Sequence, residues 1–236
     1  MLRDKIALAM RETGRPVHFL HIGKAGGTAI KFMMAEAGVR QLRFRFVGHS
    51  HKTKLASIPM GEPFFFSIRE PISRYFSAFY SRKRKGQPRI FNEWTAEEEL
   101  AFRKFPDATD LAESLDSSDD KTRNAAFMAM NAIGHVRDPL VNWFASIDEI
   151  VARPPLAIIR VEFLQDDFNR MLGSMGLHFR VMAPSDSVSA HKNDYTATPP
   201  LSPRALSNLR EHYAQDLTLF EELKRYTSVL SGGSQV

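Results

Sequence analysis

The sequence predicts an α/β fold of three layers, in which a central, mostly parallel sheet is flanked by helices. Four short apolar runs are rich in β-branched and aromatic residues, as strands buried on both faces of a parallel sheet are. Helical patterns follow three of these runs, so the order strand then helix recurs along the chain. This order is typical of α/β proteins, and we expect a single domain over residues 1–236.

The predicted elements follow one another closely in the first third of the chain and again near residue 160. The predicted strands are residues 17–22, 44–47, 64–68 and 156–159, and the helices that follow three of them are residues 28–37, 71–82 and 163–175. Each strand segment is short for a helix and too continuously apolar for a strand with one face in water. We therefore expect parallel strands with helices on the faces of the sheet.

The rest of the chain is predicted to be mainly helical. Residues 84–142 are polar and helix-prone, and we expect them to cover the sheet as a helical insert. Ser202 followed by proline is a signal for a helix N-terminus, and it predicts one long amphipathic helix that runs to about residue 226. Residues 228–236 are expected to form a disordered tail.

Composition and charge limit the function classes. The chain has 236 residues, of which 43% are hydrophobic and 25% charged, as in an ordinary soluble globular protein. Because cysteine is absent, disulfides, thiolate metal sites and cysteine nucleophiles are excluded. No apolar run is long enough to span a membrane, so we expect a cytoplasmic protein. The formal charge of +5 favours an anionic partner such as a charged cofactor and is too small to predict nucleic-acid binding.

A glycine-rich segment, residues 21–28, joins the first predicted strand to its helix. Gly26 and Gly27 permit a tight turn in which backbone N–H groups converge on an anion at the helix N-terminus. Thr28 can cap the helix and donate its hydroxyl, and Lys24 supplies a mobile positive charge. The lysine precedes the glycines, so this is neither the triphosphate-binding Gly-Lys-Ser/Thr loop nor a Gly-x-Gly-x-x-Gly loop. The alternative is an ordinary strand-to-helix turn in which Lys24 is solvated.

A second signal for anion binding follows the third predicted strand. Arg69 leaves this strand at its carboxyl end, which is the sheet edge where ligands bind and which also carries the glycine loop. Ser77 lies about two helical turns further on. It can face the same anion as Arg69 only if the inner side of its helix packs against the site. In the alternative interpretation, Arg69 pairs with an acid such as Glu70 and Ser77 is a small packing residue.

Together, the two segments resemble the sulfotransferases that use 3′-phosphoadenosine 5′-phosphosulfate (PAPS), in particular the carbohydrate type that includes the heparan sulfate 2-O-sulfotransferases and their bacterial relatives. Residues 24–28 match Lys-x-Gly-Gly-Thr, and residues 69–77 match Arg-x-Pro-x-x-Arg-x-x-Ser. The resemblance implies a P-loop-like fold whose first loop holds the 5′-phosphosulfate, while Arg69 and Ser77 bind the 3′-phosphate. The implied cofactor-binding residues are Lys24, Ala25, Gly26, Gly27, Thr28, Ala29, Arg69 and Ser77.

His49 is the implied catalytic base. It follows the second predicted strand at the same sheet edge, where members of this family carry Gly-His, and imidazole titrates near neutral pH. His51 is the rival base, and in a further alternative His49 is only a surface histidine. His18 and His21, within the first predicted strand, are expected to be core residues. Lys24 is expected to neutralise the charge that grows on the bridging oxygen of the leaving group, and no metal is expected.

The expected partners are PAPS, its product 3′-phosphoadenosine 5′-phosphate (PAP) and a hydroxyl-bearing acceptor. We favour a carbohydrate or lipid-linked sugar as the acceptor over a peptide tyrosine or a small alcohol. A lipid-linked acceptor is compatible with peripheral contact with a membrane. Residues 84–142 match nothing in the family and are expected to shape the acceptor site. Residues 191–193 resemble a basic family loop that closes over the nucleotide. The basic run at residues 82–85 is interpreted as a solvated helix C-terminus, although it also suits a glycan or an anionic lipid.

Two other functions are weighed against the sulfotransferase. A nucleotide or small-molecule kinase also carries a phosphate loop after its first strand, but the missing Gly-Lys-Ser/Thr and the presence of Arg69 and Ser77 argue against it. A non-catalytic basic module would hold an anionic polymer without turnover, and the intact Lys24 and His49 argue against that. Nothing in the sequence predicts the oligomeric state.

Overall fold

The computed structural model describes residues 14–88, 90–185 and 198–232. The chain divides into two compact units, and each is described by itself. The sheet unit contains Met1–Arg69, Val141–Lys192 and Glu222–Val236, and the helical unit contains Glu70–Leu140 and Asn193–Glu221. That residues 1–236 form one domain stays a prediction.

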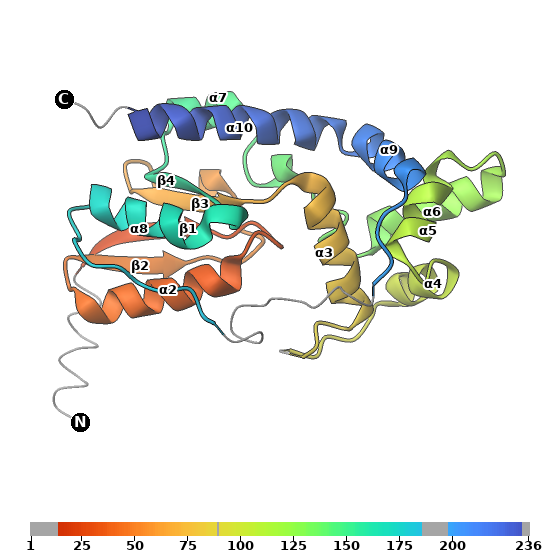
Figure 1. The fold of residues 1–236 in the computed structure, drawn as a ribbon, viewed down its shortest axis with the longest axis horizontal. Coiled ribbons are helices and arrows are strands. Elements are labelled where there is room, and N and C mark those ends of the chain that lie inside the picture. Colours follow the sequence, from red (N-terminus) through yellow and green to blue (C-terminus); the bar gives the residue numbers. More distant parts are fainter. Residues whose placement is uncertain (1–13, 89, 186–197, 233–236) are drawn as a thin grey trace. The chain divides into compact units, whose positions relative to one another are not determined.

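The sheet unit is built on a four-stranded sheet (Figure 1). The strands are β1 (Arg15–Leu20), β2 (Phe44–Gly48), β3 (Phe64–Ile68) and β4 (Ala157–Arg160). They pair in the order β2-β1-β3-β4, and every pair is parallel. The predicted α/β class with a parallel sheet flanked by helices is therefore confirmed, and each predicted strand is present with its ends moved by at most two residues.

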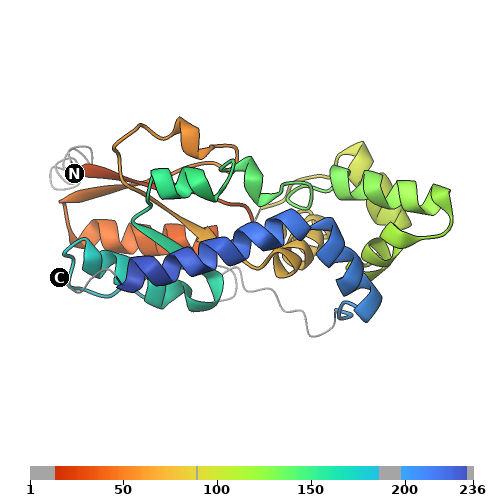
Figure 2. The same cartoon turned by 90° about the horizontal axis from the view of Figure 1, so that it is seen from above.

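Helices lie on both sides of this sheet (Figure 2). On one side are α2 (Gly27–Arg40) and α8 (Leu164–Ser174), and on the other is α7 (Ile147–Ala152). Three single-turn 3-10 helices belong to the connections between elements: η1 (Leu55–Ser57), η3 (Leu140–Asn142) and η4 (Val161–Phe163). The arrangement covers the apolar runs that predicted the strands.

Side chains alternate between the two faces of the sheet along each strand. Val17, Phe19 and Phe65 belong to one buried core together with residues of α2 and α8. Phe66 belongs to the opposite face, where its ring centroid lies 5.3 Å from that of Phe144. The whole of β3 is buried, as predicted, but burial on both faces is wrong for β2. Its face turned away from α2 is only partly covered, and Arg45 is exposed there.

The helical unit contains several helices joined by short connections. They are α3 (Pro71–Lys83), α4 (Ala96–Lys104), α5 (Ala108–Glu113), the 3-10 helix η2 (Ser114–Asp116), α6 (Asp120–Ala132) and α9 (Pro203–His212). The carboxylate of Glu70 caps α3 by accepting hydrogen bonds from the backbone N–H groups of Ile72 and Ser73, and Pro71 occupies the first helical turn. Glu70 is thus a helix cap.

The long helix predicted after Ser202 is two helices, α9 and α10 (Ala214–Gly232). Ser202 is the N-cap, as predicted, because its hydroxyl accepts a hydrogen bond from the Ala205 N–H at 3.1 Å. Tyr213 ends α9. Its side chain is buried, and its hydroxyl donates to the Val136 carbonyl at 3.0 Å, which holds the chain at the break. The prediction of one continuous helix is therefore wrong, because a tertiary contact outweighs the helical pattern.

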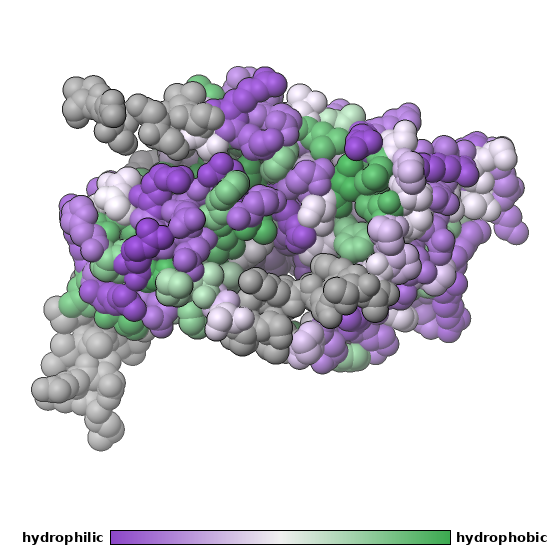
Figure 3. All heavy atoms as spheres, in the orientation of Figure 1, coloured by the Kyte–Doolittle hydropathy of each residue, from purple (hydrophilic) through white to green (hydrophobic). Residues whose placement is uncertain are grey.

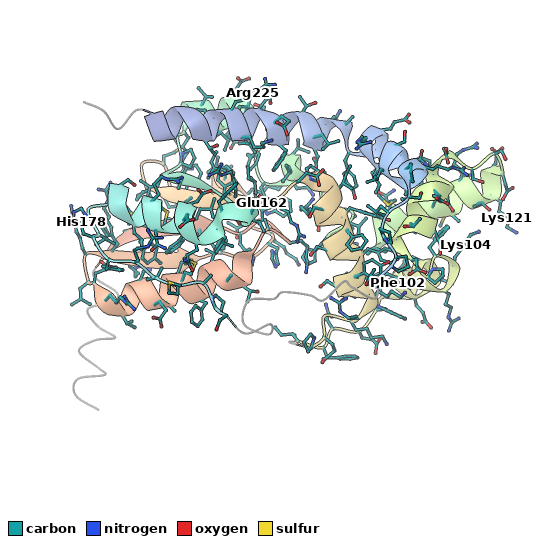
Figure 4. All side chains as sticks on the ribbon, viewed as in Figure 1. Phe102, Lys104, Lys121, Glu162, His178 and Arg225 are labelled. Atoms are coloured by element: carbon teal, nitrogen blue, oxygen red, sulfur yellow. The ribbon has the colours of Figure 1, made fainter. Side chains whose placement is uncertain are left out.

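Aromatic side chains dominate the core of the helical unit. Phe102 of α4, labelled in Figure 4, is one of them. It meets Phe79 of α3 edge to face, with ring centroids 5.3 Å apart. The buried Tyr75 hydroxyl donates to the Ala108 carbonyl at 2.7 Å. Figure 3 shows hydrophobic side chains reaching the surface beside α9, amid largely hydrophilic neighbours. This unit is thus held by a continuous apolar interior with its own satisfied polar groups.

Candidate active site

The glycine loop lies at the carboxyl end of β1 and leads directly into α2. Lys24 and Gly26 both have left-handed backbone conformations, with φ angles of 65° and 75°. Gly26 is the N-cap of α2 and Thr28 lies in its first turn, so the prediction that Thr28 caps the helix is wrong. The N-cap lies two residues before the expected one because glycine adopts the left-handed conformation without steric cost. The first N–H groups of α2 receive no side-chain cap and suit an anion.

Two neighbouring elements hold this loop in place. The hydroxyl of Ser67, a fully buried residue of β3, donates a 2.5 Å hydrogen bond to the Ala25 carbonyl. A Cβ atom added to Gly26 would lie 2.7 Å from the Leu164 Cδ1 atom at the start of α8, so the loop passes close to that helix. Figure 4 shows Glu162 just before α8, on the turn that leads into it. The loop is therefore anchored by β3 and closely packed against α8.

His21 packs directly against the second glycine of the loop. A Cβ atom on Gly27 would lie 1.9 Å from His21 Nε2, so only glycine fits beside this ring. The His21 ring also lies 3.9 Å, centroid to centroid, from the ring of His51. The indole N–H of Trp143 donates to the His51 carbonyl at 3.0 Å and fixes the backbone there. His21 is buried, as predicted, and its ring restricts residue 27 of the loop to glycine.

His49 lies immediately after β2 and is held by a hydrogen-bonded side chain of β1. Its Nε2 atom is 2.8 Å from His18 Nδ1, and the other ring nitrogen of His18 contacts the carboxylate of Glu62. Burial, and then the neighbouring His18, lower the pKa of His49 below its ordinary value of 6.5. His49 is therefore neutral at pH 7 and able to accept a proton. His18 was expected to be a core residue, and it is buried, but its contact with His49 was not predicted.

No family model, curated protein or solved structure matches this chain. What these residues do chemically therefore has to follow from their own geometry. Within the sheet unit, that geometry brings the glycine loop, His21 and His51 together at the end of β1 and joins His49 to His18 and Glu62.

The remaining predicted cofactor-binding residues lie in both units. Lys24 is partly exposed on the loop, and Ala29 is buried in the first turns of α2. Arg69 is the last residue of the sheet unit and is partly exposed, whereas Ser77 belongs to α3 of the helical unit and is buried. That Arg69 and Ser77 bind one phosphate stays a prediction.

Arg74, which the resemblance also matched, is a buried residue of the helical unit. Its guanidinium donates to the Asp138 carbonyl and lies 3.9 Å from the Asp216 carboxylate. Burial lowers the pKa of Arg74, while the nearby Tyr213 and Asp216 oppose that change. This arginine is thus enclosed by its own unit.

The basic run at residues 82–85 is not simply a solvated helix end. Arg82 is buried and forms a two-pronged pair with Glu98, and its guanidinium also donates to the carbonyls of Asn92 and Glu93. Lys85 pairs with the exposed Glu93. The prediction of a solvated run is therefore wrong for Arg82, because the segment after α3 folds back over its side chain.

The helical unit carries a hollow of about 720 Å³ between α4 and α6. Apolar and polar side chains of both helices line it, among them Leu100, Lys104, Asn124, Phe127 and Met128. Leu100 and Met128 are exposed there. That residues 84–142 shape an acceptor site stays a prediction, and the structure supplies this hollow as the place to test it.

Two searches of the described residues concern cofactors and membranes. In residues 14–88, 90–185 and 198–232, no group of three or more histidine, aspartate or glutamate side chains is arranged to hold a metal ion. Within the same part of the chain, no helix is both long and apolar enough to cross a bilayer. The predicted basic loop at 191–193 lies outside the described residues.

Proposed function

We propose that this chain is a sulfotransferase with a P-loop-like fold, which moves a sulfuryl group from PAPS to a hydroxyl of a carbohydrate or lipid-linked sugar. One observation carries the proposal: the sheet unit has an anchored glycine loop at the end of β1 and a hydrogen-bonded His49 at the end of the adjacent β2. The first feature suits an anionic donor, and the second suits removal of a proton from an acceptor.

The glycine loop has the features that a phosphosulfate group needs. Lys24 and Gly26 both have left-handed backbone conformations in the loop at the N-terminus of a 14-residue helix, a position where backbone N–H groups bind anions. Ser67 anchors the loop, so its donors need little reorganisation when the anion binds. We assign the 5′-phosphosulfate to residues 24–29. From the resemblance, we keep the 3′-phosphate with Arg69 and Ser77.

In the proposed reaction, His49 accepts the proton of the acceptor hydroxyl while the acceptor oxygen forms a new bond to sulfur. The bond between sulfur and the bridging oxygen of the phosphosulfate breaks, and PAP departs with the electron pair. Lys24 neutralises the charge that develops on this bridging oxygen, and the loop N–H groups stabilise the phosphate. His49 thus acts as a general base and Lys24 and the loop act by electrostatics, and no metal enters the proposed step.

Nucleotide selectivity is the first test of this proposal. Calorimetry should show that PAP binds more tightly than ADP, because only PAP carries the 3′-phosphate assigned to Arg69 and Ser77. Arg69→Ala should weaken PAP binding and leave ADP binding unchanged. Equal or tighter binding of ADP would point to a kinase and contradict the sulfotransferase.

Turnover is the second test. With radiolabelled PAPS and a panel of sugar, lipid-linked sugar and peptide acceptors, His49→Ala should lower kcat about 100-fold or more while PAP affinity is kept. His51→Ala is the matched variant, and it separates the two candidate bases. If His51→Ala alone abolished transfer, the base would be reassigned to His51. If wild-type protein transferred no label to any acceptor yet bound PAP, a non-catalytic module would replace the enzyme.

A further inference from the structure

Three side chains of the sheet unit form a continuous hydrogen-bonded chain beside the candidate base. Glu62, in the segment before β3, contacts His18 Nε2, and His18 Nδ1 lies 2.8 Å from His49 Nε2. Backbone hydrogen bonds hold both histidines in place: the His18 N–H donates to the Pro63 carbonyl at 2.9 Å, and the His49 N–H donates to the Phe19 carbonyl at 3.2 Å. The parallel pairing of three strands therefore sets this arrangement.

The two imidazoles meet edge to edge. Their planes are inclined by only 16°, and their centroids are 5.0 Å apart although the nearest nitrogens are 2.8 Å apart. Since the centroid separation exceeds the nitrogen separation by about two ring radii, the rings lie side by side in nearly one plane. The N–H of one ring then points along the lone pair of the other, which is the strong geometry for a hydrogen bond.

The order of donors along the chain follows from the carboxylate. An ionised carboxylate only accepts, so His18 must donate from Nε2 to Glu62. In the form of His18 with a single ring proton, that proton lies on Nε2, so Nδ1 accepts a hydrogen bond from His49. His49 must therefore carry its proton on Nε2, which leaves the lone pair on Nδ1. Glu62, which is two hydrogen bonds away, thus determines which nitrogen of His49 is the base.

We propose that His18 and Glu62 are positioning residues that fix the tautomer of His49, so that its Nδ1 atom is the one that takes the proton from the acceptor. The catalytic part of this inference rests on the proposed function. When Nδ1 is protonated, the Nε2 proton of His49 is free to shift to His18 Nδ1. The positive charge then lies on His18 beside the Glu62 carboxylate, and no other reactant is needed for this transfer.

Burying the polar ring of His18 costs desolvation free energy, which its hydrogen bonds to Glu62 and His49 offset. His18 is 7% exposed and lies in the middle of β1, where the neighbouring Val17 and Phe19 are fully buried. The His49 ring contacts His18 of β1, whose other ring nitrogen contacts Glu62 in the segment before β3. An apolar side chain would fill the space of His18 without desolvating a polar ring.

The test measures the tautomer directly. In protein with ¹⁵N-labelled histidine, long-range ¹H–¹⁵N correlation spectra at neutral pH should show His49 protonated on Nε2. Glu62→Gln should leave His49 as a mixture of tautomers, because an amide both donates and accepts. Glu36→Gln is the matched control, since Glu36 lies on the exposed side of α2 with Arg40, and it should leave the His49 signals unchanged. A wild-type His49 protonated on Nδ1 would overturn the proposal even if Glu62→Gln failed to fold.

Kinetics provide the second readout. Glu62→Gln should lower kcat about 10-fold or more with an unchanged KM for PAPS, whereas a merely structural role would leave the kcat of folded protein unaltered. A normal kcat in folded Glu62→Gln would overturn the positioning role. The tautomer measurement needs no substrate, so it decides the proposal even if the wild-type protein transfers no sulfuryl group. That last result would overturn the proposed function alone.

Discussion

Each unit of this chain contains a set of buried polar side chains, and the two sets compared below differ in what they contact. In the helical unit, Arg82 and Glu98 satisfy one another inside the fold, and Glu98 also accepts from the backbone N–H groups of Thr95 and Gly134. In the sheet unit, the polar groups Ser67 and His18 lie under the glycine loop and beside His49. The comparison teaches that the buried Arg82–Glu98 pair stabilises the helical unit itself, whereas Ser67 and His18 support residues at the carboxyl edge of the sheet.

The largest expected effect is in the helical unit. Arg82→Ala should destabilise the protein by about 3 to 5 kcal/mol, because it leaves the Glu98 carboxylate buried without its charge partner. Arg103→Ala is the matched control: it also removes an arginine–glutamate pair on α4, but Arg103 is 72% exposed and its loss should change stability by less than about 0.5 kcal/mol. Urea unfolding monitored by circular dichroism measures both. Equal destabilisation by the two variants would contradict a special stabilising role for the buried Arg82–Glu98 pair.

The next effect concerns the glycine loop. Gly27→Ala should destabilise the sheet unit by about 1 to 3 kcal/mol, because the new Cβ collides with the buried His21 ring. The same change should weaken PAP binding about 10-fold or more in calorimetry. Gly38→Ala, also in α2, meets no atom within 4 Å, and alanine is the better helix former, so it should stabilise slightly. If Gly27→Ala bound PAP with unaltered affinity, the glycine loop would not be part of the PAP site.

A smaller effect is expected at the anchor of the loop. Ser67→Ala removes the hydrogen bond to the Ala25 carbonyl and should cost about 1 kcal/mol, with a several-fold loss of PAP affinity. Ser174→Ala removes an exposed serine whose hydroxyl bonds only within its own helix end, and it should affect neither property. If Ser67→Ala lowered stability without lowering affinity, Ser67 would be a packing residue like those of the helical unit.

The smallest effect is a dependence of stability on pH. Burial alone would raise the pKa of Glu98, but hydrogen bonds from Arg82, Gly134 and Thr95 outweigh it and hold this pKa below the ordinary value of 4.5. The stabilisation is therefore complete above about pH 4.5 and is lost as the pH falls through the lower folded value. Urea midpoints between pH 7 and pH 3 should fall less steeply for Glu98→Gln than for wild type. Parallel curves would show that other carboxylates govern acid unfolding.

Several features of the fold could be predicted because they depend on residues close together in the sequence. The glycine pair before α2 and the serine–proline start of α9 are local signals, and the structure has helices at both places. The break at Tyr213 could not be predicted from the helical pattern, because it depends on a hydrogen bond to Val136, 77 residues away. The burial of Arg82 could not be predicted for the same reason. Its charge predicted exposure to solvent, but the segment after α3 encloses its side chain.

Local pattern by itself determined that this chain forms parallel strands with helices between them, that a glycine loop follows the first strand and that His49 follows the second. Hydrophobic period and turn chemistry act over a few residues, so one sequence is enough to read them. Tertiary structure alone decided which distant side chains meet: Ser67 with the Ala25 carbonyl across 42 residues, and His18 with Glu62 across 44. The physical reason is that the hydrophobic period of the sequence sets the face of an element on which a side chain lies. The partner of that side chain is set by the register and packing of separate elements.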